Sequence, residues 1–84
     1  MYQINFSKKA SKNLDKIQDP NYSNIKSAII NLAENPRPSG YIKLKNRGNA
    51  YRIRVGDYRV IYEIFDRVLV IDIIDVGHRK ALYE

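Results

Sequence analysis

The stretch "YRIRVGDYRVIYEI", residues 51–64, decides the fold, because two alternating runs meet at Gly56 and Asp57. A glycine at the first of two central positions is typical of a type II′ turn, so we predict a β-hairpin in which Val55 faces Tyr58. The remaining cross-strand pairs follow from that register: Arg54 with Arg59, Ile53 with Val60, Arg52 with Ile61, and Tyr51 with Tyr62. One face of the hairpin is therefore apolar, and the other carries all three arginines.

Two predicted helices precede this hairpin, and further strands flank it. Alternation in "YQINF" (2–6) predicts a first strand, and apolar residues at helical spacing predict helices that start after Ser7 and after Asp19–Pro20. "NPRPSG" (35–40) ends the second helix, after which the period changes from 3.6 to 2. The remaining predicted strands are "YIKLK" (41–45), "AYRIRV" (50–55), "YRVIYEIF" (58–65) and "VLVIDIIDV" (68–76), with Gly77 ending the last.

The order β-α-α-β-β-β-β predicts a single α+β domain over residues 1–84, with two layers and the helices on one side of a largely antiparallel sheet. Cysteine is absent, which excludes a disulfide framework and a thiolate site. No apolar run is long enough for a signal peptide or a membrane span, so we expect a soluble cytoplasmic protein without a membrane partner.

The net charge of +6 is concentrated in one part of the chain. Residues 37–59 contain seven basic residues and one acid, whereas residues 60–84 contain three bases and five acids. A local basic field raises the association rate with polyanions, so nucleic acid or an acidic protein is the expected partner. The alternative is a solvated basic face that only keeps the chain soluble.

Arg54 opposite Arg59 is the feature of the hairpin that folding alone does not explain. Like charges directly opposite in a sheet are destabilising, on the order of 0.2–1 kcal/mol. A bound polyanion would offset this repulsion, because guanidinium groups bind phosphate oxygens bidentately. Alternatively, Glu63 and Asp72 share this face and neutralise the arginines as surface ion pairs, although two acids do not balance three arginines.

The C-terminal "DVGHRKALYE" (75–84) adds a second set of candidates, His78, Arg79 and Tyr83. Histidine has an unperturbed pKa of about 6.5, which suits proton transfer near neutral pH. We expect His78 at the edge of the arginine-bearing face, although a lone histidine is often only a surface residue.

Two segments of the chain carry a family resemblance. "LKNRGNAYRIRVGDYRVIYEI" (44–64) and "VIDIIDVGHRKALYE" (70–84) resemble the RelE toxins of toxin–antitoxin pairs, within the RelE/ParE superfamily. The resemblance covers the whole chain and implies a RelE-like fold. It also implies that the protein enters the ribosomal A site and cuts mRNA there. The implied reaction is attack by a ribose 2′-hydroxyl that leaves a 2′,3′-cyclic phosphate, without a metal ion or cofactor. An acidic, partly disordered RelB-like antitoxin is the implied partner.

Residue roles follow from the same resemblance. Arg59 and Arg79 match the phosphate-binding and C-terminal catalytic arginines of the family, and Tyr83 falls near its base-pocket tyrosine. Arg52 and Arg54 stand where well-known members have lysines, and a guanidinium is a poor proton shuttle. We therefore expect His78, or as second choice Tyr83, to move protons. The predicted catalytic residues are Arg52, Arg54, Arg59, His78, Arg79 and Tyr83, and the predicted RNA-binding residues are Lys43, Lys45 and Arg47.

Two other functions fit the same pattern. ParE-like toxins share the fold and poison DNA gyrase without cutting RNA. The second alternative function is that of a non-catalytic RNA-binding module. However, the tyrosines of the hairpin fall on the hairpin's apolar face, which leaves no exposed aromatic platform for stacking bases.

Overall fold

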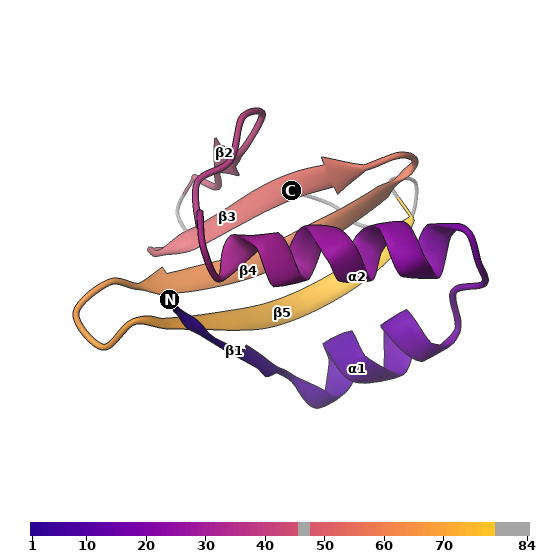
Figure 1. Ribbon diagram of the computed structural model, residues 1–84, viewed down its shortest axis with the longest axis horizontal. Helices are drawn as coiled ribbons and strands as arrows, with labels where there is room; N and C mark the ends of the chain where they lie inside the picture. Colours follow the sequence, from indigo (N-terminus) through magenta and orange to yellow (C-terminus); the bar gives the residue numbers. More distant parts are fainter. Residues whose placement is uncertain (46–47, 79–84) are drawn as a thin grey trace.

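In a computed structural model, two helices cover one face of a five-stranded sheet, as Figure 1 shows. The structure describes residues 1–45 and 48–78. The elements, in chain order, are β1 (Gln3–Phe6), α1 (Lys8–Asp15), α2 (Asn21–Leu32), β2 (Ile42–Lys43), β3 (Ala50–Val55), β4 (Tyr58–Phe65) and β5 (Val70–His78). This is the predicted element order, and the two-layer α+β class is confirmed.

The sheet has the strand order β1-β5-β4-β3-β2, and every neighbouring pair is antiparallel except β1 with β5. The hairpin register between β3 and β4 is the predicted one, from Val55 opposite Tyr58 to Tyr51 opposite Tyr62. Gly56 has a φ of +61°, as the first central residue of a type II′ turn requires. The local turn signal was therefore sufficient to set the pairing of these strands.

Polar side chains begin both helices where the sequence predicted. Ser7 caps α1, and its hydroxyl accepts a hydrogen bond of 2.9 Å from the Ala10 N–H. At the start of α2, Asp19 accepts hydrogen bonds from the Ser23 N–H at 3.0 Å and from the Ser23 hydroxyl at 2.6 Å. Pro20 occupies the position before the first helical residue. Both helices thus begin at defined residues, and both lie over the same face of the sheet.

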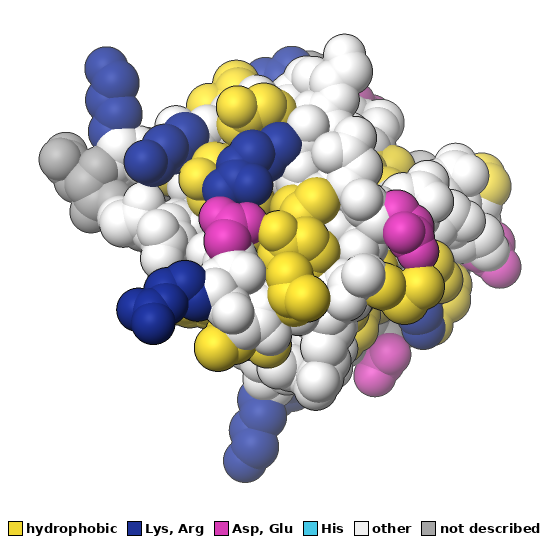
Figure 2. All heavy atoms as spheres, turned by 60° about the vertical axis from the view of Figure 1, so that its left-hand side comes forward, with side chains coloured by type: hydrophobic (Ala, Val, Ile, Leu, Met, Phe, Trp, Pro, Cys, Tyr) yellow, Lys and Arg dark blue, Asp and Glu magenta, His cyan; other side chains and the backbone are white. Residues whose placement is uncertain are grey.

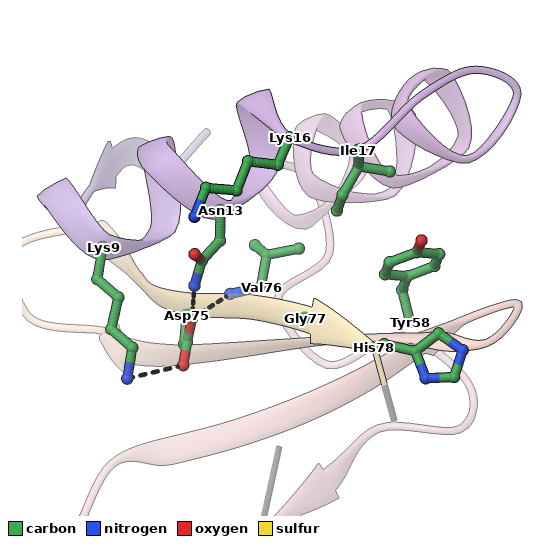
Figure 3. A pocket seen from close by; sticks show the side chains of 9 residues that line it. All are labelled: Lys9, Asn13, Lys16, Ile17, Tyr58, Asp75, Val76, Gly77 and His78. Carbon is green, nitrogen blue, oxygen red and sulfur yellow. Dashed lines mark hydrogen bonds and ion pairs between the residues drawn. The ribbon is translucent and has the colours of Figure 1, made fainter. Parts of the chain in front are cut away.

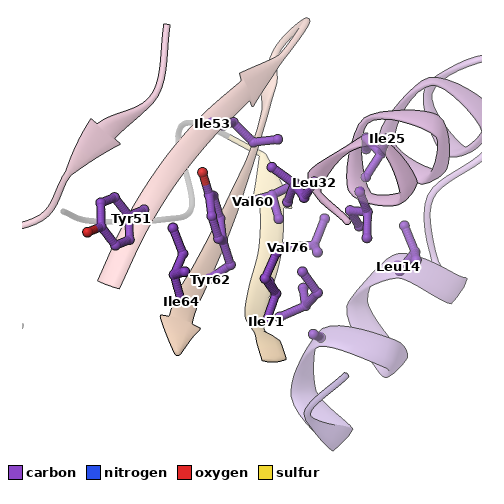
Figure 4. Close-up of a cluster of buried hydrophobic side chains, with 13 residues drawn as sticks. Leu14, Ile25, Leu32, Tyr51, Ile53, Val60, Tyr62, Ile64, Ile71 and Val76 are labelled. Atoms are coloured by element: carbon purple, nitrogen blue, oxygen red, sulfur yellow. The ribbon is translucent and has the colours of Figure 1, made fainter. Parts of the chain in front are cut away.

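The core lies between the helices and the apolar face of the sheet (Figure 4). Leu14 of α1 and Ile25 of α2 are buried against the sheet residues Val60, Tyr62 and Val76. Tyr62 is fully buried, and its hydroxyl donates a hydrogen bond of 2.8 Å to the Pro36 carbonyl. The predicted apolar face of the hairpin is the core face, so the arginines lie on the face without helices.

Two strand predictions were wrong at their ends. β2 has two residues instead of five. The last strand starts at Val70 instead of residue 68, because residues 66–69 form a turn in which Leu69 has a left-handed φ of +56°. The same strand runs through Gly77, which we expected to end it, because Gly77 and His78 still pair with Arg59 and Tyr58.

A β-bulge interrupts the pairing of β4 with β5. Ile61 is opposite Asp75 and Tyr62 is opposite Ile73, so Ile74 is an extra residue in β5. The bulge reverses the alternation of the strand: Ile71 and Ile73 face the core before it, and Val76 faces the core after it. After residue 75, each residue of β5 therefore faces the side of the sheet opposite to the one that strict alternation predicts.

Across residues 1–45 and 48–78, neither helix is long and apolar enough to cross a bilayer.

Candidate nucleic-acid interface

Three arginines lie on the helix-free face of the sheet, which we call the arginine face (Arg52, Arg54 and Arg59). Arg54 and Arg59 are directly opposite each other in the β3–β4 ladder. Arg54 is exposed, whereas Arg59 is half-buried and its Nε atom is buried. Directly opposed arginines concentrate positive charge where an anion can contact both.

Arg52 is less accessible than the sequence suggested. It lies between Ile42 of β2 and Ile61 of β4, and only 6% of the residue is exposed. These two apolar residues flank it on the same sheet face, where cross-strand neighbours lie about 5 Å apart. Of the three arginines, Arg52 is therefore the most buried and Arg54 the most exposed.

A small apolar cluster, which we did not predict, adjoins Arg52. Leu44, Ala50 and Ile61 are buried together, and Ile74 packs against them. Its signal was present in the sequence, because these residues alternate with the core residues of their own strands. The cluster separates the basic end of the face from its other end.

Two acids lie at that other end. Glu63 is directly opposite Asp72, which accepts a hydrogen bond of 3.3 Å from the Asn5 side chain. Glu63 is four positions after Arg59 in β4, which is about 13 Å at the rise of a strand. The two acids therefore lie at the opposite end of this face from the Arg54–Arg59 pair.

His78 does not lie on the arginine face, and that expectation was wrong. It is opposite Tyr58 on the helix-covered face, with the two ring centroids 5.4 Å apart in an edge-on arrangement. Both side chains line a hollow of about 390 Å³ between α1 and the end of β5 (Figure 3). The β5 residue opposite Arg59 is Gly77. The physical reason is the bulge, which reverses the alternation before residue 77.

The predicted RNA-binding lysines also sit apart from the arginines. Lys43 is opposite Tyr51, so it lies on the other side of β2 from Leu44. Lys45 is exposed in the turn that follows, and both lysines line a shallow hollow of about 460 Å³ at the sheet edge. The other predicted site residues, Arg47, Arg79 and Tyr83, lie outside the described residues.

Arg37, part of the basic segment 37–59, has a structural role on the helix-covered face. Its guanidinium pairs with Asp66 at 3.0 Å and lies 5.2 Å from the centroid of the Tyr51 ring. Asp66 also accepts a hydrogen bond of 2.6 Å from the Tyr2 hydroxyl. These two bonds, with Arg37 first, lower the pKa of the Asp66 carboxyl, and the bond to Asp66 raises the pKa of Tyr2. Figure 2 faces this end of the molecule, where basic, acidic and hydrophobic side chains are interspersed.

A second polar cluster, which sequence reasoning missed, joins α1 to the bulge. Asp75 is 6% exposed, and its carboxylate contacts the Lys9 ammonium at 3.1 Å and accepts a hydrogen bond of 2.8 Å from the Asn13 side chain. It also accepts a hydrogen bond of 2.9 Å from the Val76 N–H. A signal existed: strict alternation from Ile73 directs Asp75 toward the helix layer, where a buried carboxylate requires polar partners.

Comparison with known proteins identifies the family. The family described as "ParE toxin of type II toxin-antitoxin system, parDE" matches residues 4–83. The chain belongs to this family. Within the RelE/ParE superfamily it is RelE-like: the mRNA interferase toxin RelE of Escherichia coli (strain K12) is 27% identical over 81 residues, which cover 94% of this chain and 84% of that protein. A putative toxin RelE1 of Methanocaldococcus jannaschii is 29% identical over 88 residues, covering 99% and 96%.

Solved structures agree with the fold. The isolated E. coli RelE toxin has a TM-score of 0.81 at 26% identity, covering 93% of this chain and 84% of that one. In the archaeal RelE–RelB complex from Pyrococcus horikoshii OT3, the similar chain has a TM-score of 0.83 at 30% identity, with 96% and 98% covered. The two-layer architecture is therefore that of RelE toxins.

Proposed function

We propose that this chain is the toxin of a toxin–antitoxin pair and that it cleaves mRNA on the ribosome. The observation that carries the proposal is the directly opposed pair Arg54 and Arg59 on the helix-free face. Such a pair opposes folding by the repulsion of like charges, and a phosphate bound between the two guanidinium groups offsets that repulsion. Similarity to a relative named mRNA interferase supports RNA as the source of the phosphate.

The chemistry is an internal displacement at phosphorus. The 2′-oxygen forms a bond to phosphorus and loses its proton to a base, while the bond to the 5′-oxygen breaks and that oxygen gains a proton from an acid. The products are a 2′,3′-cyclic phosphate and a 5′-hydroxyl. Negative charge grows on the non-bridging oxygens during this step, and Arg54, Arg59 and, from the family pattern, Arg79 stabilise it. Arg52 adds positive potential from its buried position.

The proton transfers need a group other than arginine, since a guanidinium stays charged at neutral pH. His78 is in contact with Tyr58 on the other face of the sheet, which argues against a direct role at a phosphate held by Arg59. Of the two candidates we therefore favour Tyr83. Its hydroxyl has an ordinary pKa of about 10, which neighbouring cations would lower.

Lys43 and Lys45 place positive charge at the β2 edge of the sheet, and Arg47 follows them in the sequence. We propose that they contact RNA phosphates away from the cleaved bond, because the two lysines are exposed and lie beside a shallow hollow. These contacts position the RNA and take no part in the reaction.

An antitoxin is the second proposed partner. Solved complexes pair RelE chains with RelB, in P. horikoshii and in E. coli among others. A chain with a net charge of +6 has the sign that attracts an acidic, partly disordered RelB-like segment. Such a segment would compete with RNA for the same charges.

A second function, inhibition of DNA gyrase without RNA cleavage, is supported by the match of the chain to a family of ParE toxins. In that case the arginine face would bind an acidic protein surface. The two functions predict different damage to the cell.

Mapping RNA 5′ ends after tightly controlled expression separates these functions. We expect new ends inside translated codons with the parent chain, and loss of these ends with Arg59→Ala. Lys12→Ala, which removes an exposed cation from α1, is the matched control and should cut as the parent does. Intact mRNA together with gyrase-linked DNA breaks would establish the second function instead.

A further inference from the structure

The bulge in β5 determines which residue lies beside Arg59. Beyond it, Gly77 is opposite Arg59 on the arginine face and His78 is opposite Tyr58 on the core face. Without the bulge, pairing continued from Tyr62–Ile73 would place Val76 opposite Arg59 and His78 opposite Asp57, so a valine side chain would lie beside Arg59. The bulge therefore keeps a position without a side chain at the centre of the proposed site.

The bulge is fixed by a buried carboxylate. Asp75 binds Lys9 and Asn13 of α1 and also accepts a hydrogen bond from the N–H of Val76, the next residue in the strand. The contacts with Lys9 and Asn13 join the bulge to the helix layer, and the dashed lines in Figure 3 mark these two contacts and the bond from Val76. A slip of the strand by one residue would break the contacts with Lys9 and Asn13 and leave a buried charge without its cationic partner, which is strongly unfavourable.

The backbone does not explain why residue 77 is glycine. The described glycines with a positive φ are Gly40, Gly48 and Gly56, and Gly77 is not among them. It pairs with Arg59 inside a regular part of β5, where glycine is a poor choice because it lacks a side chain to pack. Glycine within a strand often marks a site where a ligand approaches the backbone closely.

We propose that Gly77 is an access position for the substrate: the missing side chain leaves room for the RNA phosphate to reach Arg59, and Asp75 is a positioning residue that holds Gly77 there through the bulge. This inference rests on the proposed RNA cleavage. It adds a steric requirement to a site that was otherwise defined by charge.

The test is a size series at residue 77. Gly77→Ala and Gly77→Val should fold with an unchanged or higher melting temperature, because the backbone there accepts any residue and a strand favours β-branched side chains. Single-turnover cleavage of mRNA on programmed ribosomes should fall with side-chain size. We expect a loss of at least about 10²-fold for valine, since a displacement of about 1 Å at a reacting group has that effect.

Asn5→Val is the matched control. Asn5 is opposite Asp72, so this change places a β-branched side chain on the same face two strands away from Arg59. The control should cleave like the parent. A Gly77→Val chain that is as active as the parent overturns the access role, and so does a Gly77→Ala chain that no longer folds, because the glycine would then be structural.

The positioning role of Asp75 has its own test. Asp75→Asn keeps an oxygen for the Val76 N–H but removes the charge that faces Lys9, and Lys9→Ala removes the same ion pair from the helix side. Both should lower the single-turnover rate at saturating ribosome while ribosome affinity stays unchanged, and both should weaken the ring-current shift of His78 caused by Tyr58. Lys8→Ala, at the neighbouring exposed lysine, should change neither. Parental rates in both variants overturn the positioning role.

Failure of this inference differs from failure of the proposed function. If the parent chain cleaves ribosome-bound mRNA and Gly77→Val cleaves it equally, only the inference is wrong. If the parent chain does not cleave at all, the proposed function is wrong, and the access role falls with it.

Discussion

Replacing Arg54 by glutamate should make the protein more stable and abolish RNA cleavage. Arg54 faces Arg59 directly, so the change converts a repulsive cross-strand pair into an attractive one. Each contribution is on the order of 0.2–1 kcal/mol, so the combined gain is about 0.4–2 kcal/mol in the free energy of unfolding. For a domain of this size, 1 kcal/mol corresponds to about 4–8 °C in the melting temperature.

Thermal and urea unfolding followed by circular dichroism measure that gain, and single-turnover cleavage on programmed ribosomes measures the loss. Lys12→Glu is the matched control, since it changes the net charge equally at an exposed position. Lys12 is in the last turn of α1, where a cation interacts favourably with the helix dipole, so this control should lose about 0.3–1 kcal/mol and keep its activity. A destabilised Arg54→Glu chain, or an active one, would refute the reasoning.

The other predictions concern the core, the surface network and the partner. Ile53→Asp should unfold the chain, because an unpaired carboxylate in the core costs several kcal/mol; a cooperative melt would show that the hairpin faces are inverted. Above the ordinary aspartate pKa of 3.8, the Asp66→Asn variant should be less stable than the parent. The two stabilities should converge as the pH falls through the lowered pKa of folded Asp66, because the parent then loses the stability that its ionised carboxylate provides. A constant difference in unfolding free energy across this pH range would contradict the prediction. Ribosome binding should weaken steeply between low and physiological salt, and a flat titration would indicate a protein target.

The hairpin was predictable because its information is local. Gly56 and Asp57 select a two-residue turn, and the turn alone fixes every pair from Val55–Tyr58 to Tyr51–Tyr62. The helix starts were predictable for the same reason, since a cap contacts backbone groups only a few residues away.

The end of β5 was not predictable by the same rules. Its bulge is held by contacts between Asp75 and α1, more than sixty residues earlier in the chain. The sequence prediction put His78 on the wrong face of the sheet because of that one extra residue. The burial of Arg52 was missed for a related reason, because the short strand β2 brings Ile42 beside it only once the intervening loop has folded.

The most direct test of RNA cleavage by the arginine face uses purified protein and ribosomes programmed with an mRNA that carries 2′-deoxyribose at the nucleotide whose 3′-phosphate is cut. The account predicts that unmodified mRNA yields a 2′,3′-cyclic phosphate end, that the deoxy substitution abolishes the cut, and that Arg59→Ala greatly slows cleavage of the unmodified message. Cleavage that persists on the deoxy substrate, or a parent chain that leaves the unmodified mRNA intact, would contradict it.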